Sequence, residues 1–326
     1  MRYLITGGAG FVGSHLAEYL IHRGDEVVVL DNLLTGSLEN IEHLHKSPGF
    51  RFVEGSVMDK NLVAEIMEKC DAVFHLAAAV GVKFVMENLV TSIEINVRGT
   101  ENVLSVAAEG GKKVLITSSS EVFGKSNKAS FHEEDDLIIG PPHKVRWCYA
   151  TSKLLDEFLA MGYFLEKGLP VVIVRLFNVC GPRQTGRYGM VIPRFVKQAL
   201  NGEPITVYGT GKQIRSFLHV KDAVVGMVGL MEEKRAEGMV FNIGNPQGIT
   251  IEALAIKVKE LTGSSSPIVY IPYEEVYGPH FEDLIYRVPD VNRAKAVIGF
   301  QPKYSLEDIL KDTISYIKES GNPCST

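Results

Sequence analysis

The first half of the chain alternates short apolar runs with segments of helical periodicity. Six runs are rich in β-branched residues and bounded by Gly, Asp or Ser, as is typical of buried strands, and they cover 4–6, 27–30, 50–53, 72–76, 113–117 and 171–176. Between the first two, Leu16, Ala17, Leu20 and Ile21 form one helical stripe, with Gly24 after it. This repetition predicts an α/β fold with a parallel sheet covered by helices on both faces.

The pattern changes after residue 177. Glycine and proline become dense there, and the regular alternation of strands and helices ends. We expect this half to form a smaller lobe over the carboxyl edge of the sheet. The predicted domains are therefore 1–177 and, mainly, 178–326, with a segment near 219–245 that returns to the first lobe.

Composition and charge narrow the class of protein. Hydrophobic residues make up 45% of the chain and charged residues 22%, an ordinary globular balance. The net charge of −5 gives no electrostatic reason to expect nucleic acid or an anionic membrane as partner, so any anionic ligand must be held by local features. No signal-peptide pattern and no run of about 18 apolar residues is present. Histidines and cysteines show no ligand spacing, so no metal site is predicted.

The cysteines lie far apart and include no C-x-x-C pair, which indicates reduced thiols in a cytoplasmic protein. They are Cys70, Cys148, Cys180 and Cys324.

A glycine-rich loop follows the first predicted strand and opens the first predicted helix. It reads Thr6-Gly7-Gly8-Ala9-Gly10-Phe11-Val12-Gly13. Glycines let the backbone turn tightly and approach a pyrophosphate, which the N–H groups at the helix start can bind. Asp31 closes the second strand, where a carboxylate accepts hydrogen bonds from the adenosine ribose and repels a 2′-phosphate. No basic residue follows closely, since Asn32 comes next, so the predicted cofactor is NAD rather than NADP.

Tyr149 and Lys153 lie four residues apart, on one face of a predicted helix. A free phenol has a pKa near 10 and is a poor base at neutral pH, but a neighbouring ammonium favours the phenolate. Tyr149 could then remove a hydroxyl proton while a hydride passes to NAD⁺. Upstream, Thr117-Ser118-Ser119-Ser120-Glu121 ends a predicted strand, where a hydroxyl could bind the same substrate oxygen.

Together these motifs resemble the extended short-chain dehydrogenase/reductase family. The resemblance also rests on His75-Leu76-Ala77-Ala78, on Ser118 to Gly124, on Arg175 to Arg183 and on Val207-Tyr208-Gly209 through Arg215, and it runs from Met1 to about residue 315. It implies a Rossmann doubly wound parallel sheet, a smaller C-terminal α/β domain that binds a nucleotide sugar, and a homodimer built on a four-helix bundle.

The resemblance also implies site residues. Those expected at the NAD site are Gly7, Gly10, Phe11, Val12, Gly13, Asp31, Asn32, Val57, Leu76, Ala77, Ala78, Thr117, Tyr149 and Lys153. Those expected to act in catalysis are Tyr149, Lys153, Ser119, Ser120 and Glu121. Those expected to bind a UDP-sugar are Asn178, Arg183, Arg187, Val191, Tyr208, Arg215 and Arg287. The chain departs from the family at Ser56, where members often have an aspartate near the adenine.

The members that the chain resembles share oxidation of the sugar at C4 and differ in the later steps of the reaction. A 4,6-dehydratase would carry Asp-Glu where this chain has Ser120-Glu121. Ser120 to Gly124 resembles the Ser-Glu-Val-Tyr-Gly of UDP-glucuronate decarboxylases, as do the stretches 140–149 and 277–290. A C6 carboxylate beside a C4 ketone belongs to a β-keto acid and leaves readily as CO₂. Arg287 could hold that carboxylate by a bidentate contact, and Glu121 could orient the sugar or assist proton transfer at C5.

Decarboxylation of UDP-glucuronate is therefore favoured, and three other functions stay open. The first is 4,6-dehydration, which the missing acid at Ser120 disfavours. C4 epimerisation of UDP-glucose or UDP-glucuronate is supported by the stretch 181–190, which carries Arg183 and Arg187 in a layout common among epimerases. A non-catalytic NAD sensor with the same fold would generally lose the tyrosine or the lysine, and both are present here.

Four further features favour structural roles. We interpret His75 as a packing residue under the cofactor, and Arg175, within a buried strand, as an ion-pair partner. The run 133–136 (Glu-Glu-Asp-Asp) is expected to be a solvated loop face. Trp147 fits a sugar pocket and a core equally well.

Overall fold

The computed structural model describes residues 1–186, 190–278 and 284–320. Its larger lobe is built on a seven-stranded sheet in the order β11-β6-β5-β4-β1-β2-β3, and every pair of neighbours is parallel. The strands are β1 (Arg2–Thr6), β2 (Glu26–Asp31), β3 (Phe50–Glu54), β4 (Ala72–His75), β5 (Lys113–Ser119), β6 (Val171–Leu176) and β11 (Met239–Ile243). The six strands expected from the apolar runs are confirmed, and the order reverses at β1 as in a doubly wound Rossmann sheet.

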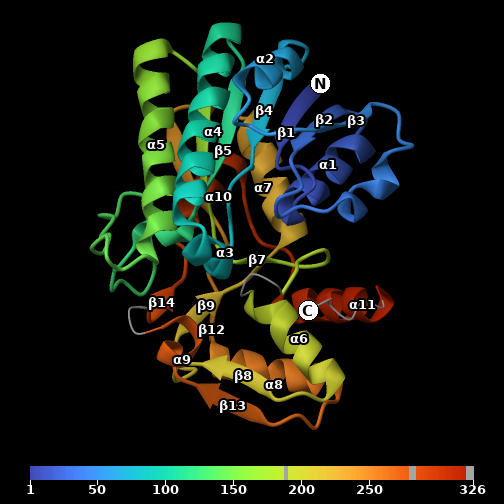
Figure 1. Cartoon of the computed structure of the whole chain (residues 1–326), viewed down its shortest axis with the longest axis vertical. Coiled ribbons are helices and arrows are strands. Elements are labelled where there is room, and N and C mark those ends of the chain that lie inside the picture. The colour runs from blue at the N-terminus through green and yellow to red at the C-terminus, as the bar shows by residue number, and fades with distance from the viewer. Residues whose placement is uncertain (187–189, 279–283, 321–326) are drawn as a thin grey trace.

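Helices cover both faces of this sheet, because alternate residues of each buried strand point to opposite sides (Figure 1). Tyr3 and Ile5 of β1 pack in a core with α1, α7 and α10, whereas Leu4 packs in a core with α2, α4 and α5. The bounds are α1 (Phe11–His22), α2 (Lys60–Glu68), α3 (Val82–Glu87), α4 (Leu89–Gly110), α5 (Trp147–Lys167), α7 (Val220–Glu232) and α10 (Asn292–Ile298).

The segment expected to return to the first lobe contains α7 and β11. β11 adds the edge strand beside β6, and α7 packs against α1. A later helix, α10, packs on α7 and β11 as well, although it lies beyond the segment near 219–245. The chain therefore crosses between the lobes more often than the sequence pattern indicated.

The smaller lobe has its own core at the lower end of the molecule in Figure 1. There α6 (Val191–Asn201), α8 (Ile251–Thr262) and α11 (Leu306–Glu319) pack together beside the parallel pair β8 (Ile205–Tyr208) and β13 (Ile268–Ile271). The remaining elements are η1 (Leu38–Asn40), η2 (Glu42–Leu44), η3 (Ser120–Phe123), β7 (Val179–Cys180), β9 (Ile214–Ser216), β10 (Leu218–His219), η4 (Lys234–Ala236), β12 (Gly248–Thr250), α9 (Tyr273–Tyr277) and β14 (Tyr286–Arg287). None of the described helices is long and apolar enough to cross a membrane.

The structure corrects the expectation for the run 133–136. Glu133 is only 6% exposed, and its Oε1 accepts a hydrogen bond from the backbone N–H of Asn242 at 2.8 Å. Asn242 belongs to β11, an edge strand with a row of N–H groups that no neighbouring strand satisfies. The glutamate is buried because it provides that missing acceptor, so the run is not a uniformly solvated face.

Two other structural interpretations are settled. Arg175 is 4% exposed and makes a two-point ion pair with Glu157, with Nε–Oε1 at 2.9 Å and Nη2–Oε2 at 2.7 Å, which confirms its structural role. Trp147 is 2% exposed and packs with Ala150 and Leu284, so it belongs to the core rather than to the sugar pocket.

Candidate active site

A cavity of about 530 Å³ lies between the carboxyl ends of the sheet strands and the smaller lobe. The first lobe provides the glycine loop, the ends of β2, β4 and β5, and the start of α5. The second lobe provides residues of α6, β8, β9 and β14. A crevice beyond the carboxyl ends of strands, where the strand order reverses, is where open α/β sheets bind ligands.

The glycine loop turns so tightly that only glycine fits at several of its positions, and the bare backbone can then approach a pyrophosphate closely. Gly7 has φ 73°, and a Cβ there would lie 2.7 Å from the backbone N of Ala77. A Cβ on Gly13 would lie 2.7 Å from Cα of Gly8. Gly10 precedes α1 without a side-chain cap, so N–H groups of the first turn are available to an anion. Helix α1 begins at Phe11, earlier than its apolar stripe indicated.

Asp31 is the last residue of β2 and is 8% exposed. Its Oδ2 accepts from the backbone N–H of Ala9 at 2.9 Å, and its Oδ1 accepts from Leu33 at 2.8 Å. Burial raises the pKa of this carboxyl, and the backbone N–H groups of Leu33 and Ala9 oppose the shift. The carboxylate lines the cavity together with Asn32 and Val57, so it can still accept hydrogen bonds from a ribose.

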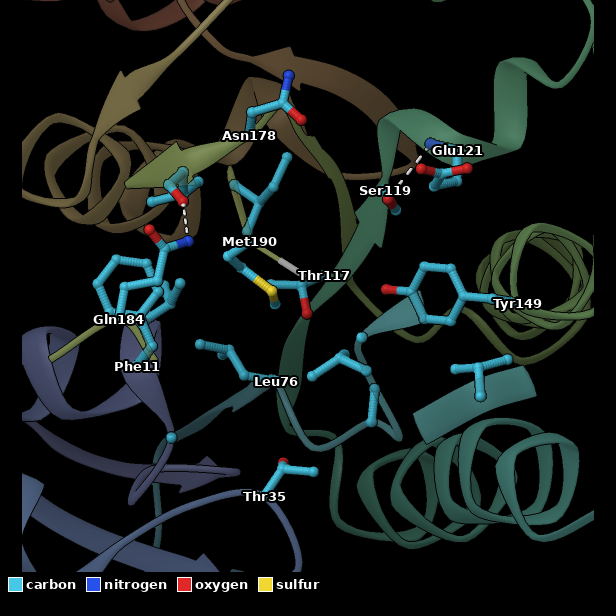
Figure 2. A pocket seen from close by; sticks show the side chains of 18 of the residues that line it. Phe11, Thr35, Leu76, Thr117, Ser119, Glu121, Tyr149, Asn178, Gln184 and Met190 are labelled. Carbon is cyan, nitrogen blue, oxygen red and sulfur yellow. Dashed lines mark hydrogen bonds between the residues drawn. The ribbon is translucent and has the colours of Figure 1, made fainter. Parts of the chain in front are cut away.

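Tyr149 lies in the first turn of α5, and its hydroxyl points into the pocket toward Thr117 (Figure 2). Burial raises the pKa of this phenol, while the Lys153 ammonium and a hydrogen bond with the Ser119 side chain lower it. Ser119 ends β5 and also accepts from the backbone N–H of Glu121 at 3.2 Å. The phenol therefore depends on Lys153 and Ser119 to act as a base.

Lys153 is 2% exposed, one helical turn after Tyr149. Its Nζ donates to Oδ2 of Asp156 at 2.9 Å. Burial by itself lowers the pKa of the ammonium, but nearby acidic groups, led by Asp156, reverse the effect and raise it. Lys153 is thus a cation in a site that is shielded from water.

Glu121 joins an arginine cluster at the same end of the cavity. Its Oε1 lies 2.6 Å from Nη1 of Arg287, and its Oε2 accepts from Nη2 of Arg146 at 3.1 Å. Arg287 and Arg146 are buried, at 7% and 8% exposed. Two guanidinium groups therefore converge on one carboxylate beside Tyr149.

His75 lies under the cavity at the end of β4 and is 1% exposed. Its ring nitrogens pair with the hydroxyls of Thr6 at 2.7 Å and Thr100 at 3.0 Å. Burial lowers the pKa of His75 to about 3. The ring is therefore neutral and held in place, which confirms the expected packing role.

The smaller lobe brings most of the expected substrate residues to the cavity. Its wall includes Asn178, Val191, Tyr208, Arg215 and Arg287. β14 pairs in parallel with β9, and this register sets Arg287 directly beside Arg215. Asn178 has φ 35°, and its side chain donates to the backbone oxygen of Ser216 at 2.8 Å, which ties the cavity wall to β9.

Two expected residues are not brought to this cavity. Arg183 lies instead on the outer face of α1, where its Nη2 is 2.5 Å from Oε2 of Glu18. The backbone at Arg183 is left-handed, with φ 67°, and directs the side chain toward α1. Arg187 lies outside the described residues. Every other residue expected at the NAD site or in catalysis lines the cavity.

Comparison with known proteins identifies the family. The model of the NAD dependent epimerase/dehydratase family matches residues 3–244. The chain belongs to this family. The match spans the whole glycine loop, Asp31 and the Tyr149/Lys153 pair, and it confirms the expected kinship with extended short-chain dehydrogenases.

Relatives in this family are similar over nearly the whole chain. A UDP-N-acetyl-alpha-D-glucosaminuronate decarboxylase of Bacillus cytotoxicus is 46% identical over 322 residues, covering 98% of this chain and 99% of the relative. The UDP-glucuronic acid decarboxylase 1 of Arabidopsis thaliana is 39% identical, covering 97% of this chain and 69% of the relative. Among solved structures, a UDP-glucuronic acid 4-epimerase of Bacillus cereus, in complex with UDP-glucuronic acid and NAD, superposes with a TM-score of 0.88 at 28% identity, covering 98% and 100%.

The chain is an enzyme of this family, and its cofactor is NAD. The residues present fit the dinucleotide. The glycine loop is packed so tightly that a Cβ at Gly7 or Gly13 would collide with backbone atoms, so only glycine lets the chain turn this closely beside a pyrophosphate. The Asp31 carboxylate lies where it disfavours a 2′-phosphate.

Two charged residues of the site were not expected from the sequence. Arg146 stands within the stretch that resembles decarboxylases, yet nothing in its local pattern indicated contact with Glu121. Asp156 follows Lys153 by three residues on α5, and that spacing alone could have predicted a pair.

Proposed function

We propose that this enzyme decarboxylates a UDP-linked hexuronate by way of a 4-keto sugar. The observation that carries the proposal is the cluster of Glu121, Arg287 and Arg146, which lies in the same cavity as Tyr149 and Lys153. A hexuronate differs from a neutral hexose by its C6 carboxylate, and a pair of buried guanidinium groups is a suitable partner for that carboxylate. The similarity to two groups of decarboxylases supports the same reaction.

In this mechanism Tyr149 removes the proton of the C4 hydroxyl, and the Lys153 ammonium stabilises the phenolate. NAD, when bound, accepts the hydride from C4. Ser119 hydrogen-bonds with the phenol and can orient the same hydroxyl. The C4 ketone makes the C6 acid a β-keto acid, so the C5–C6 bond breaks with loss of CO₂ and leaves an enolate between C4 and C5. After C5 takes a proton, Tyr149 returns its proton to the C4 oxygen as the hydride is restored to C4, which gives a UDP-pentose.

The arginines have distinct parts in this proposal. Arg287 lies beside Arg215 and exchanges part of its contact with Glu121 for the substrate carboxylate. Arg146 keeps hold of Glu121, which as a carboxylate can orient the sugar and relay a proton from a water molecule to C5 after CO₂ leaves. Ser120 is 2% exposed, so we assign it to support of this turn rather than to proton transfer.

The experiment offers the enzyme and NAD⁺ two substrates, UDP-glucuronate and UDP-N-acetylglucosaminuronate, each ¹³C-labelled at C6. The relatives are named for one or the other, so both belong in the test. We expect labelled CO₂ and a UDP-pentose product, followed by NMR, from at least one. Tyr149→Phe should retain NAD and lose about 10²–10⁴-fold in turnover. A non-catalytic sensor would be indifferent to that change. Retention of C6 in every product would overturn the proposal.

C4 epimerisation is the second candidate, because the chain superposes on a UDP-glucuronic acid 4-epimerase with a TM-score of 0.88. In that case UDP-galacturonate would form with C6 retained. The same NMR experiment separates the two reactions in one spectrum.

We also propose a homodimer through α4 and α5, as the family resemblance implies. These helices lie side by side along one flank of the sheet (Figure 1). They expose apolar side chains, namely Val90 at 70%, Ile93 at 45%, Leu155 at 49%, Phe158 at 68% and Leu165 at 73%. Several exposed apolar side chains on two adjacent helices are typical of an interface. Light scattering should give a dimer mass, and Phe158→Glu should give a monomer.

The cytoplasmic location stays a prediction.

A further inference from the structure

A second carboxylate, buried in α5, touches the ammonium group on which the base depends. Asp156 is fully buried, and its Oδ2 accepts from Nζ of Lys153 at 2.9 Å. Its other oxygen, Oδ1, has no hydrogen-bond partner within the described part of the chain. A buried carboxylate with one oxygen unsatisfied is costly to keep. The contact with the Lys153 ammonium offsets part of the cost of burying this carboxylate.

The other charged and titratable groups around Lys153 are already balanced. Glu157, next on the helix, is paired with Arg175 on β6. Glu121, after β5, is paired with Arg287. His75 on β4 is neutral, because burial lowers its pKa to about 3.

The groups on α4 that reach this region carry no charge. The Asn96 side chain pairs with the hydroxyl of Ser152, and the Thr100 hydroxyl donates to the backbone oxygen of Asn96. Of the described acidic neighbours, Asp156 is therefore the one that pairs directly with the Lys153 ammonium.

This arrangement has two opposed electrostatic effects. The carboxylate stabilises the ammonium in a site where burial favours the neutral amine. The same negative charge acts on Tyr149 and disfavours its phenolate. Asp156 also ties the lysine side chain to its own helix, so the ammonium has a defined position before the dinucleotide arrives.

We propose that Asp156 is a positioning residue that keeps Lys153 charged and in place and thereby sets the pH window in which Tyr149 works as the base. Both edges of that window move in the same direction when the carboxylate is lost. Without Asp156 the Tyr149 phenolate forms at lower pH, and the Lys153 ammonium loses its proton at lower pH. The proposal rests on the Tyr149/Lys153 oxidation step of the proposed function.

The test compares Asp156→Asn with the unaltered enzyme, both full length and saturated with NAD⁺, from pH 5.5 to 10. Turnover is followed with whichever of the two UDP-hexuronates reacts faster. We expect the rise of turnover on the acidic side of the profile to move to lower pH. The loss of turnover on the alkaline side should also move to lower pH, by about one to three units, so that it enters the measured range. Asp156→Glu, which keeps the charge, should retain the unaltered profile. Glu260→Gln, which removes an exposed carboxylate in the smaller lobe, is the matched control and should shift neither limb.

A uniform loss of turnover at every pH, with neither limb displaced, would mean a merely structural role and overturn the proposal. A second measurement does not depend on any variant or substrate. NMR titration of ¹⁵N-lysine in the unaltered NAD complex should show that Lys153 loses its proton at higher pH than a free lysine side chain, and loss at lower pH would equally overturn it. Because this titration needs no turnover, it separates failure of the proposal from failure of the proposed reaction.

Discussion

The ion pair between Arg175 and Glu157 offers the sharpest test of how the active-site side of the sheet is held together. Arg175 donates twice to Glu157, at 2.9 and 2.7 Å, and once to the backbone oxygen of Glu133, at 3.2 Å. The Ser118 hydroxyl of β5 donates to Oε1 of Glu157 at 2.5 Å, and Nε of Arg175 donates to that same oxygen. The pair thus joins β6 to α5, the helix of Tyr149, and to the end of β5.

Arg175→Met removes one partner and leaves the Glu157 charge buried, since Glu157 is 4% exposed. Leaving one charge of such a pair uncompensated costs about 3–5 kcal/mol. Domains are stable by only about 5–15 kcal/mol, so the expected loss is about a fifth of the stability or more. The companion change Glu157→Gln should recover part of that loss, because its amide oxygen still accepts from Ser118 and the buried charge is gone.

The assay is urea unfolding at a fixed NAD concentration, followed by the fluorescence of Trp147. This is the chain's one tryptophan, and it lies buried at the start of the same helix. Refolding from urea establishes that the transition is reversible. If Arg175→Met lowered the free energy of unfolding by less than about 1 kcal/mol, or if the double variant were no more stable than the single one, the electrostatic reasoning would be refuted.

Three further outcomes are expected. Gly13→Ala should abolish NAD binding in a calorimetric titration, because its Cβ would lie 2.7 Å from Cα of Gly8, whereas Gly162→Ala, with open space around the Cβ, should bind normally. Asp31→Asn should weaken NAD about 10–100-fold, the value of hydrogen bonds to a charged acceptor, and an unchanged Kd would contradict the assigned role. His75 has a folded-state pKa of about 3 against 6.5 when unfolded, so its contribution to stability is present above pH 6.5 and lost as the pH falls toward 3. Between pH 7 and 5 this loss is about 2 kcal/mol, and urea unfolding of His75→Gln should lack it.

The features that could be predicted from sequence are those whose signal is local. The six strands follow from short apolar runs, and the glycine loop from the glycines of one turn. Asp31 at the end of its strand and the Tyr149/Lys153 spacing likewise need only a few neighbouring residues. The parallel sheet then brings these segments to one edge, so a list of local motifs already predicts most of the cofactor side of the cavity.

The substrate side could not be predicted in the same way, because its contacts join distant segments. The pairing of Glu121 with Arg287 depends on β14 lying beside β9, two strands of two and three residues whose register no local pattern indicates. Glu133 was expected in solvent because its own segment is polar, yet it is buried by the need of β11 for an acceptor. Arg183 belongs to a motif shared with relatives, but a left-handed backbone directs it elsewhere.

The arginine cluster also explains how an acidic chain can bind an acidic ligand. The net charge of −5 repels anions, but salt screens most of this repulsion at distances beyond the Debye length of about 8 Å. Inside the cavity, Arg146, Arg215, Arg287 and Lys153 are all less than a tenth exposed, so their fields are hardly screened. Glu121 contacts both Arg146 and Arg287, and Asp156 contacts Lys153, so two negative charges offset part of the four positive ones. A ligand that brings both a diphosphate and a carboxylate can therefore replace internal contacts with its own, whereas a neutral hexose leaves the Glu121 pairing intact. This difference is why the arrangement favours a hexuronate over the neutral sugar of the same shape.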